Sequence, residues 1–328
     1  MTQPNLVVLL EADTATRAVI AETIGTTARI TYITDLGDNA RADALAAATV
    51  VMARNTAQEL RSSELDLIKR ARLLQFVTAG IDYIPLAQFP AHLPIAANGG
   101  AYSEPMAEHA AALAFAAAKR IIVEHGKLAR GEFDQFRQNR MLAGSTCGIL
   151  GFGGIGVATA RVMRGLGLKV HAINRRGGTT EPVDWIGADS ALDDLLHASD
   201  VLVLSLPLTP KSKHLIGARE LGLMKPDAIL INLARGEIVD EAALYAHLKA
   251  TPTFTACIDA WWIEPVRHGK FIMDHPFLEL PNVIGSPHNS ASVKGWRFTA
   301  IRRATANARR ALVGELPLHL VPVEDRMM

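Results

Sequence analysis

The sequence predicts an α/β protein in which parallel β-strands alternate with helices. This prediction rests on the alternation of strand-like and helix-like runs and on the length of the chain. Short runs rich in Val, Ile and Leu alternate with runs of helical periodicity, and this alternation occurs in two separate series along the chain. Such alternation indicates parallel strands joined by right-handed crossovers. A chain of 328 residues is also long enough for two domains of ordinary size, each with a substantial core.

The first series occupies about the first hundred residues. Its predicted strands are Leu6–Leu10, Ile30–Ile33, Val50–Ala53, Leu74–Val77 and Ile95–Ala97. Its predicted helices are Thr14–Ile24, Asn39–Ala46 and Ala57–Arg72. A single long helix is predicted next, from about Glu104 to Arg130, because this stretch is rich in alanine.

The second series begins at Cys147. Its predicted strands are Gly148–Leu150, Lys169–Ile173, Val201–Leu204, Ala228–Ile231, Phe254–Ile258 and Val283–Ile284. The run Val201–Leu204 is apolar throughout, which is typical of a strand buried on both faces of a parallel sheet. The predicted helices of this part are Ile155–Leu166, Ala191–Leu196 and a closing helix from about Lys294 to Val313.

The composition is that of a globular enzyme, with 49% hydrophobic and 20% charged residues. The formal net charge is +1, so no overall field attracts nucleic acid or an anionic membrane. The N-terminus lacks the basic start and long apolar run of a signal peptide, and the apolar run Ala110–Ala118 is too short to span a bilayer. We therefore expect a cytoplasmic protein with no nucleic-acid, membrane or metal partner, and buried free thiols at Cys147 and Cys257.

A glycine-rich turn follows the strand Gly148–Leu150 and opens the next helix. Its spacing is G-x-G-x-x-G, in the hexapeptide Gly151-Phe152-Gly153-Gly154-Ile155-Gly156. The first glycine allows the tight turn, the second lets the backbone approach a pyrophosphate, and the third allows close packing of helix on strand. The helix N-terminus offers N–H groups and a partial positive charge to phosphate. Inside a β-α-β unit this pattern indicates a dinucleotide site; a glycine-rich turn without a ligand is the alternative.

The strand after this helix ends at Asn174, which lies eighteen residues after Gly156 and precedes Arg175 and Arg176. An NAD-selective site has Asp or Glu near this position, and a carboxylate there would repel a 2′-phosphate. A neutral Asn would not repel it, and the two arginines could hold it through charge-assisted hydrogen bonds. We therefore predict NADP as the preferred cofactor and NAD as the second choice. The alternative is that both arginines are surface residues and selectivity is loose.

Polar residues follow the later strands, at the edge where an open α/β sheet places its ligand crevice. Arg235 follows one strand, Asp259 and Glu264 follow the next, and His288 follows the last. Reduction of a 2-oxo acid needs a cation for the carboxylate and carbonyl, and a proton donor that works near neutral pH. A carboxylate beside the His would favour its protonated form and fix its tautomer. Taken singly, each residue has a structural alternative, such as a helix cap, a solvated side chain or a loop histidine.

The order of these motifs resembles that of the D-isomer-specific 2-hydroxyacid dehydrogenases over nearly the whole chain. The matching segments are 142–156, 204–210, 231–236, 259–265 and 286–288, with 77–82 and 98–109 upstream. The resemblance implies two similar doubly wound domains around a cleft, one flavodoxin-like and one Rossmann, joined by long helices. Residues 1–102 and 290–328 would form the substrate domain, and residues 103–289 the dinucleotide-binding domain.

The resemblance also implies the roles of the catalytic side chains. Arg235 would bind the substrate carboxylate and orient the carbonyl, and His288 would be the acid/base with Glu264 as its partner. Together these residues favour an oxidoreductase that transfers a hydride from NADPH or NADH to a small 2-oxo acid such as glyoxylate or hydroxypyruvate. The alternative is a dinucleotide-sensing, corepressor-like binding protein, since the family fold also serves that purpose; the near-zero net charge and the complete Arg, Glu and His set favour the enzyme.

Other residues receive binding roles from the same resemblance. Asp259 would hold the nicotinamide carboxamide, and the backbone around Ala79 and Gly80 would receive the substrate carboxylate. The cofactor would also be lined by Leu206, Pro207, Ser212 and Ala234. The pair Trp261–Trp262 departs from the family pattern, and either packs behind the catalytic loop or forms a pocket wall. A homodimer is expected, because the linking helices of family members usually pack across a two-fold axis.

Overall fold

The computed structural model describes residues 3–326 and divides into two compact units. The first unit contains the chain up to Tyr102 together with the residues from Val293 onward, and the second unit is Ser103–Ser292. Each unit is built on one parallel sheet, of five strands in the first and seven in the second. The predicted α/β class with two parallel-sheet domains is therefore confirmed.

The sheet of the first unit has the strand order β2-β1-β3-β4-β5. Its strands are β1 (Asn5–Val8), β2 (Arg29–Tyr32), β3 (Val50–Ala53), β4 (Leu73–Phe76) and β5 (Ile95–Ala96). All neighbouring strands pair in parallel. This is the flavodoxin-like order, in which the chain starts near the middle of the sheet and extends it in both directions.

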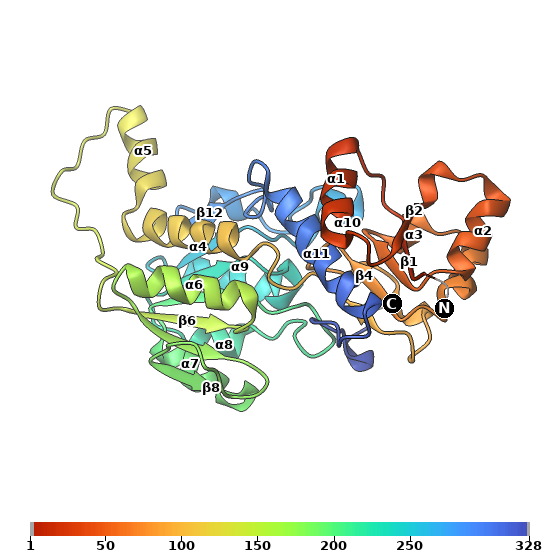
Figure 1. The fold of residues 1–328 in the computed structure, drawn as a ribbon. Coiled ribbons are helices and arrows are strands. Elements are labelled where there is room, and N and C mark those ends of the chain that lie inside the picture. The colour runs from red at the N-terminus through yellow and green to blue at the C-terminus, as the bar shows by residue number, and fades with distance from the viewer. Residues whose placement is uncertain (1–2, 327–328) are drawn as a thin grey trace. The chain divides into compact units, whose positions relative to one another are not determined.

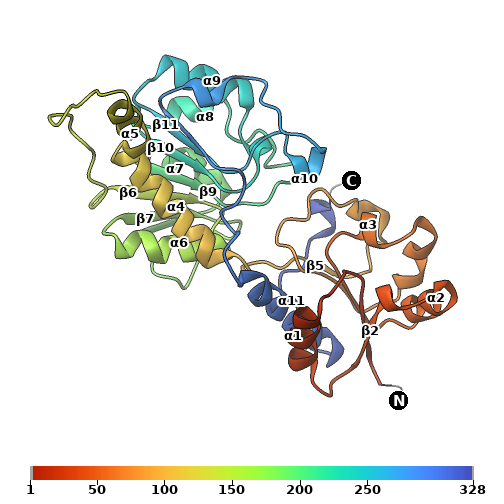
Figure 2. The same cartoon turned by 90° about the horizontal axis from the view of Figure 1, so that it is seen from above.

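Helices cover both faces of this sheet. On one face, α1 (Thr14–Ile24) and α11 (Trp296–Leu312) lie side by side over one set of alternate strand residues (Figure 2). On the other face, α2 (Asp38–Ala46) and the 3-10 helix Ser62–Ile68 pack on the remaining set. The two faces thus hold separate buried clusters, as the two-residue periodicity of strands requires.

The sheet of the second unit has the strand order β12-β11-β10-β9-β6-β7-β8. Its strands are β6 (Thr146–Leu150), β7 (Lys169–Ile173), β8 (Trp185–Gly187), β9 (Val201–Leu204), β10 (Ile229–Asn232), β11 (Thr255–Ile258) and β12 (Val283–Gly285). All pair in parallel, and β9 is buried on both faces as predicted. Starting from β6, the chain first adds β7 and β8 on one side and then adds β9 to β12 on the other side. This is the strand order of a Rossmann fold, and the direction in which strands are added reverses between β6 and β9.

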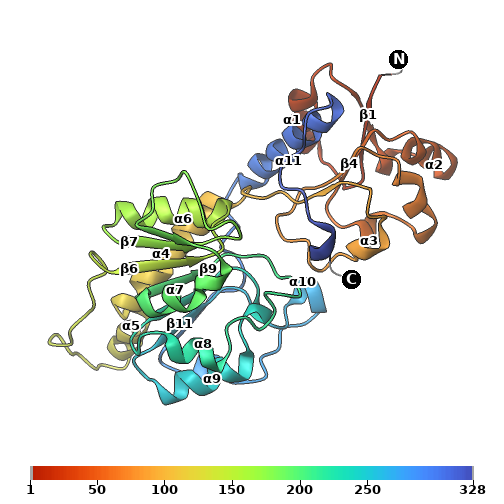
Figure 3. The same ribbon diagram turned by 90° about the horizontal axis from the view of Figure 1, so that it is seen from below.

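Two layers of helices enclose this second sheet (Figure 3). One layer contains α4 (Ser103–Ala118) and α6 (Gly154–Gly165), which pack closely on each other. The other layer contains α7 (Leu192–Ala198), α8 (Ala218–Leu223) and α9 (Glu241–Ala250). Right-handed crossovers explain this distribution. Strands are added in opposite directions on the two sides of the point of reversal, so the connecting helices lie on opposite faces of the sheet.

The single helix predicted from Glu104 to Arg130 is wrong. The structure has two helices, α4 and α5 (Ile121–Ala129), separated at Arg120, whose backbone adopts the left-handed conformation with φ 54°. Figure 1 shows α5 turning away from the line of α4. The alanine-rich composition favours helix on both sides of the break, but it carries no signal for a single residue that leaves the right-handed region.

The helix predicted over Ala57–Arg72 is also wrong. The structure has a four-residue helix, α3 (Thr56–Glu59), and then the 3-10 helix Ser62–Ile68. The Glu59 carboxylate accepts the backbone N–H groups of Arg54 and Asn55, and Leu60 is extended. The buried Leu60 thus interrupts the predicted helix, and the Arg61 N–H then donates to the Glu64 carboxylate at the start of the 3-10 helix.

Both cysteines are free and buried, as predicted. Burial raises the pKa of each thiol to about 12, so neither is ionised near neutral pH. Over residues 3–326, the structure shows no helix that combines the length and the apolar character needed to cross a bilayer.

Candidate active site

The glycine-rich turn lies where the strand order of the second sheet reverses. Gly151 follows β6 with a φ of 102°, and a Cβ on it would lie 2.5 Å from the backbone N of Leu206, which follows β9. A Cβ on Gly156 would lie 2.5 Å from the carbonyl oxygen of Gly151. Both glycines are therefore required by close backbone packing, independently of any ligand.

Gly153 differs from these two glycines. It precedes α6, and beyond its neighbours in the chain no side chain or backbone atom lies within 4 Å of the point where its Cβ would stand. Gly154, Ile155 and Gly156 form the first turn of α6, where backbone N–H groups have no partner within the helix. Open space beside a helix N-terminus, at the reversal point of the strand order, fits the pyrophosphate of a dinucleotide.

The loop after β9 adjoins this turn. The Ser205 hydroxyl donates to the Gly151 carbonyl at 2.9 Å, and Leu206 packs directly on Gly151. Farther along, the Ser212 hydroxyl donates to the Pro207 carbonyl at 2.7 Å and accepts the Thr209 N–H at 2.8 Å. The structure therefore places Leu206 beside the glycine-rich turn, and gives the Ser212 hydroxyl a role in shaping its own loop.

Asn174 organises the turn that follows β7. Its side-chain oxygen accepts the Arg176 N–H at 3.0 Å, and its side-chain nitrogen donates to the Gly178 carbonyl at 3.0 Å. Arg175 and Arg176 are exposed on this turn. A neutral side chain that bonds its own backbone is typical of a tight turn, so Asn174 has a structural reason to be there as well as the predicted one.

Arg235 lies in a tightly constrained segment after β10. The Asn232 side chain accepts the Ala234 N–H at 3.0 Å and donates to the Arg235 carbonyl at 2.8 Å. A Cβ on Gly236 would clash with the peptide that joins Trp261 to the next residue. The half-buried Arg235 side chain also donates to the Ala234 carbonyl at 2.6 Å. The backbone around this arginine is therefore fixed on both sides.

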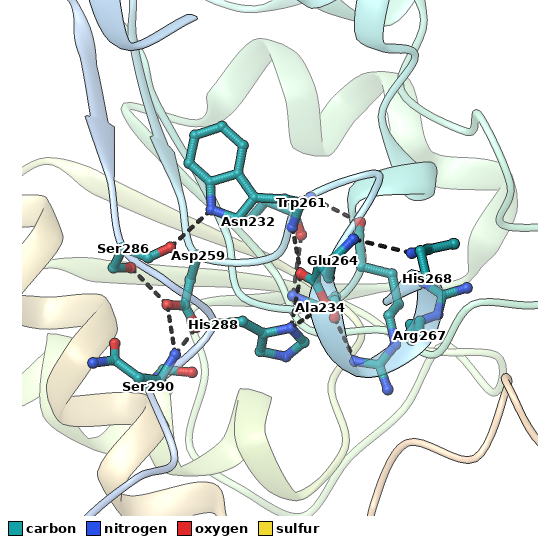
Figure 4. Close-up of polar contacts among 12 residues, drawn as sticks. Asn232, Ala234, Asp259, Trp261, Glu264, Arg267, His268, Ser286, His288 and Ser290 are labelled. Carbon is teal, nitrogen blue, oxygen red and sulfur yellow. Dashed lines mark hydrogen bonds and ion pairs between the residues drawn. The ribbon is translucent and has the colours of Figure 1, made fainter. Parts of the chain in front are cut away.

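His288 and Glu264 form a hydrogen-bonded pair. The Nδ1 atom of His288 lies 2.8 Å and 2.9 Å from the two carboxylate oxygens of Glu264 (Figure 4). Glu264 is buried, and one of its oxygens also accepts the backbone N–H of Trp261 at 2.6 Å. The His288 backbone has a φ of 50°, in the left-handed region. A carboxylate at Nδ1 leaves Nε2 as the ring nitrogen that can serve a substrate.

The environment of Glu264 favours its charged form. Burial is the largest single influence and raises the pKa of its carboxyl. The hydrogen bond and charge of His288, the Trp261 N–H and the charge of Arg235 together outweigh it, so the pKa lies below its usual range. Glu264 is therefore an ionised partner of His288 near neutral pH.

The short helix α10 (Pro265–His268) anchors the backbone of Glu264. The Glu264 N–H donates to Nδ1 of His268 at 3.0 Å. Arg267 forms an ion pair with Glu237 at 2.8 Å, which ties α10 to the segment next to Arg235. His268 thus bonds the backbone of Glu264 and not its carboxylate. The carboxylate can therefore bond His288.

Asp259 is fully buried and holds the loop that carries His288. Its carboxylate accepts the Ser286 hydroxyl at 2.6 Å and the backbone N–H groups of Asn289 and Ser290 at 3.2 and 3.3 Å (Figure 4). Asp259 therefore has a structural role, in addition to the contact with the nicotinamide that the resemblance implies.

The two tryptophans are buried, Trp261 with 4% and Trp262 with 9% of its surface exposed. Their indole N–H groups donate to the carbonyls of Ser286 and Val239, both at 2.8 Å. Trp262 also stacks on Phe277. These contacts favour the interpretation that the pair packs behind the catalytic loop.

The second unit thus brings together Arg235, Asp259, Glu264 and His288, because β10, β11 and β12 are adjacent parallel strands whose carboxyl ends meet at one edge. The predicted substrate-binding residues Ala79 and Gly80 lie in the first unit, after β4. Over the described residues 3–326 there is no group of three or more His, Cys, Asp or Glu side chains suited to a metal ion.

Sequence reasoning missed several residues that support this site. Ser286, Asn289 and Ser290 bond the Asp259 carboxylate, and His268 bonds the Glu264 backbone. The only sequence signal for them is their closeness in the chain to His288 or Glu264. Chemically, the assembled groups provide a cation, a carboxylate-supported imidazole and a glycine-rich turn at a helix N-terminus, which suits reduction of an anionic carbonyl compound.

Comparison with known proteins supports one family. The family model described as "D-isomer specific 2-hydroxyacid dehydrogenase, NAD binding domain" matches residues 111–290. A glyoxylate reductase from Aeropyrum pernix is 34% identical over 233 residues, which is 68% of this chain and 67% of that protein. A glycerate dehydrogenase from Methylorubrum extorquens is 34% identical over 237 residues, which is 70% of this chain and 72% of that protein. For a D-3-phosphoglycerate dehydrogenase from Methanocaldococcus jannaschii, 32% identical over 263 residues, the match spans about half of that protein, 49%.

Solved structures agree in fold. A glycerate dehydrogenase related protein from Thermoplasma acidophilum superposes with a TM-score of 0.65 at 27% identity, covering 93% of this chain and 99% of that chain. A D-isomer specific 2-hydroxyacid dehydrogenase from Xanthobacter autotrophicus Py2, in complex with NADPH and MES, gives a TM-score of 0.78 at 22% identity, covering 98% and 99%. At that identity the second likeness shows the fold alone.

Proposed function

This chain belongs to the D-isomer specific 2-hydroxyacid dehydrogenase family, and we propose that it reduces small 2-oxo acids, such as glyoxylate or hydroxypyruvate, with NADPH. The products would be the corresponding 2-hydroxy acids, with D configuration where C2 is a stereocentre. The observation that carries the proposal is the pair formed by His288 and the buried Glu264, at 2.8 Å. A histidine held by a carboxylate through one nitrogen can deliver a proton from the other.

In this proposal, Nε2 of His288 holds the proton that the substrate carbonyl oxygen receives. Glu264 stabilises the positive charge of the imidazole before the transfer and fixes the ring through Nδ1. Arg235 binds the substrate carboxylate and orients the carbonyl, and its guanidinium stabilises negative charge that grows on the carbonyl oxygen. The electrostatic influence of Arg235 on Glu264 supports a common site for the three residues.

The dinucleotide, when bound, supplies the hydride. We propose that Gly153 and the N–H groups of Gly154 to Gly156 hold its pyrophosphate, since this is the open part of the turn. Leu206, Pro207, Ser212 and Ala234 would line it, and Asp259 would bind its carboxamide while holding the His288 loop. The dinucleotide-binding domain would thus be residues 103–289, which lie within the unit Ser103–Ser292.

We propose NADP as the preferred form, and NAD as the second choice. The support is local: the neutral Asn174 stands where an acid would repel a 2′-phosphate, and its turn presents the exposed Arg175 and Arg176. The first unit would be the substrate domain, with the backbone of Ala79 and Gly80 receiving the substrate carboxylate.

We also propose that the protein is a homodimer. α5 contains no buried residue, and this helix and the segment after it expose large apolar side chains: Ile121, Ile122, Leu128, Phe133 and Phe136. Several large apolar side chains exposed on one helix and the segment after it are typical of a protein–protein contact.

The experiment is a screen of 2-oxo acids with NADPH and with NADH, followed by loss of absorbance at 340 nm. We expect turnover of glyoxylate or hydroxypyruvate, and greater efficiency with NADPH. Tight dinucleotide binding without turnover of any 2-oxo acid would instead favour the binding-protein alternative.

A further inference from the structure

The loop that carries His288 is held by a chain of hydrogen bonds that begins on another element. Asp259 accepts the Ser286 hydroxyl at 2.6 Å, and the Nε2 atom of His109 lies 3.0 Å from the same hydroxyl oxygen. His109 lies in the second turn of α4, which packs against α6, β10 and β11. All three side chains belong to the second unit.

The direction of these bonds follows from the proton count. A serine hydroxyl has one proton, and Ser286 gives it to the Asp259 carboxylate, which also accepts two backbone N–H groups. The oxygen of Ser286 can then only accept from His109. Nε2 of His109 must therefore carry a proton and donate it. This N–H also lies 3.7 Å from the fully buried Asp259 carboxylate, where a donor or positive charge offsets the cost of burial.

Ser286 is fixed at its backbone as well. Its carbonyl accepts the indole N–H of Trp261 at 2.8 Å, and its own N–H donates to the Ile258 carbonyl at 2.9 Å. Two residues later, His288 has the left-handed φ of 50°, a conformation that a residue with a Cβ adopts only at a cost. Such a conformation persists where the surrounding contacts determine it fully.

We propose that His109 is a positioning residue: its Nε2–H donates to Ser286, and the chain from His109 through Ser286 to Asp259 holds the loop in the conformation that presents His288. This inference rests on the proposed reductase function, because presenting His288 matters only if His288 acts on a substrate. His109 would act through Ser286, to which its hydrogen bond is made.

The test compares three substitutions of His109 in the purified enzyme. His109→Leu removes the hydrogen-bond donor. His109→Asn keeps a donor, but its side chain is too short to reach Ser286. His109→Gln places an amide nitrogen close to the position of Nε2. We expect His109→Leu and His109→Asn to lower kcat about tenfold, with the Kd for NADPH within about twofold of wild type, and His109→Gln to restore kcat to within about threefold. Glu108→Gln, an exposed neighbour on the same helix, is the matched control and should leave kcat unchanged.

If His109 had only a structural role, its substitution would lower the Tm, and His109→Gln would not restore kcat. The proposal is overturned if His109→Leu keeps wild-type kcat, if Gln is no better than Leu at equal Tm, or if kcat falls only in parallel with NADPH affinity. A second readout does not depend on turnover: imidazole ¹⁵N spectra of the wild type should show a proton on Nε2 of His109, with a changed shift in Ser286→Ala. An Nε2 without a proton would overturn the proposal even if the protein reduced no 2-oxo acid. Failure of this proposal can therefore be distinguished from failure of the proposed function.

Discussion

At the scale of single residues, Glu264 determines which nitrogen of His288 faces a substrate. Because Nδ1 is bonded to the carboxylate, the reactive proton must be on Nε2. His288→Gln should therefore lower kcat by about a hundredfold or more, the scale of general acid catalysis. Steady-state kinetics with NADPH measures this, and NADPH binding followed by fluorescence is the control, which should change little. A variant with wild-type kcat would remove His288 from the mechanism.

Asn174 carries the cofactor preference at the same scale. Asn174→Asp places a negative charge beside Arg175 and Arg176, where it would repel a 2′-phosphate and accept bonds from ribose hydroxyls. We expect the ratio of kcat/KM for NADPH over NADH to fall about tenfold or more, since charge-assisted hydrogen bonds contribute about 1.5–3 kcal/mol. The side chain also bonds the Gly178 carbonyl, so Asn174→Ser is the control for loss of that contact without added charge. An unchanged ratio in Asn174→Asp would contradict the proposed selectivity.

The sequence predicts the reactive residue types of the candidate site but not their supports. Arg235, Glu264 and His288 each follow a strand, and parallel strands deliver such residues to one edge. The bonds from Ser286 and His109 toward Asp259 depend on how a loop and a helix meet in space. No spacing in the chain predicts that meeting.

At the scale of elements, Asp200 joins three segments of the second unit. It accepts the Thr146 N–H at 2.8 Å, Arg140 at 2.8 Å and Lys225 at 3.0 Å. Burial raises the pKa of its carboxyl and is the largest influence, but the Thr146 N–H, Lys225 and Arg140 together keep it below its usual range. A lowered folded-state pKa means that the charged carboxylate stabilises the fold above the unfolded-state pKa, and that this contribution is lost as pH falls through the folded-state value.

Asp200→Asn should therefore lower the free energy of unfolding at pH 7 by about 2 kcal/mol, the scale of a hydrogen-bonded charge. The difference from wild type should shrink below about pH 4. Urea unfolding across this pH range measures both effects. Asp227→Asn is the matched control, because Asp227 faces the same arginine but is exposed, and such pairs contribute about 0–1 kcal/mol. An equal loss in both variants would contradict the account.

The helices show where local sequence is sufficient. α1 begins and ends as predicted, because Asp13 caps its first turn and Gly25 ends it with a positive φ. The break at Arg120 has no such signal, since a basic residue in a helical composition gives no reason to leave the helix. The strand Trp185–Gly187 was not predicted, because three residues are too few to show a period and only pairing with β7 identifies them as a strand.

At the scale of the whole molecule, the exposed apolar side chains on α5 and the segment after it lead to a prediction about assembly. We expect a mass of about twice the 35.3 kDa of the chain by light scattering. The double variant Ile122→Asp and Phe136→Asp should shift the protein to one copy, because two charges would be buried without partners. Leu316→Asp, on the first unit, is the control and should leave the mass unchanged, since the exposure of Leu316, 73%, lies between those of Ile122 and Phe136. A monomeric wild type would contradict the proposed homodimer.

In the proposed reaction, a hydride passes from the dinucleotide to the carbonyl carbon of a 2-oxo acid. The most direct test uses NADPH deuterated at the transferable position of C4, incubated with the enzyme and with glyoxylate or hydroxypyruvate. We expect one deuterium at C2 of the hydroxy acid by NMR, with D configuration where C2 is a stereocentre in the unlabelled product. We expect this product to be lost in His288→Gln. A product without deuterium at C2, or no product from either acid while the dinucleotide binds tightly, would contradict the proposed reaction.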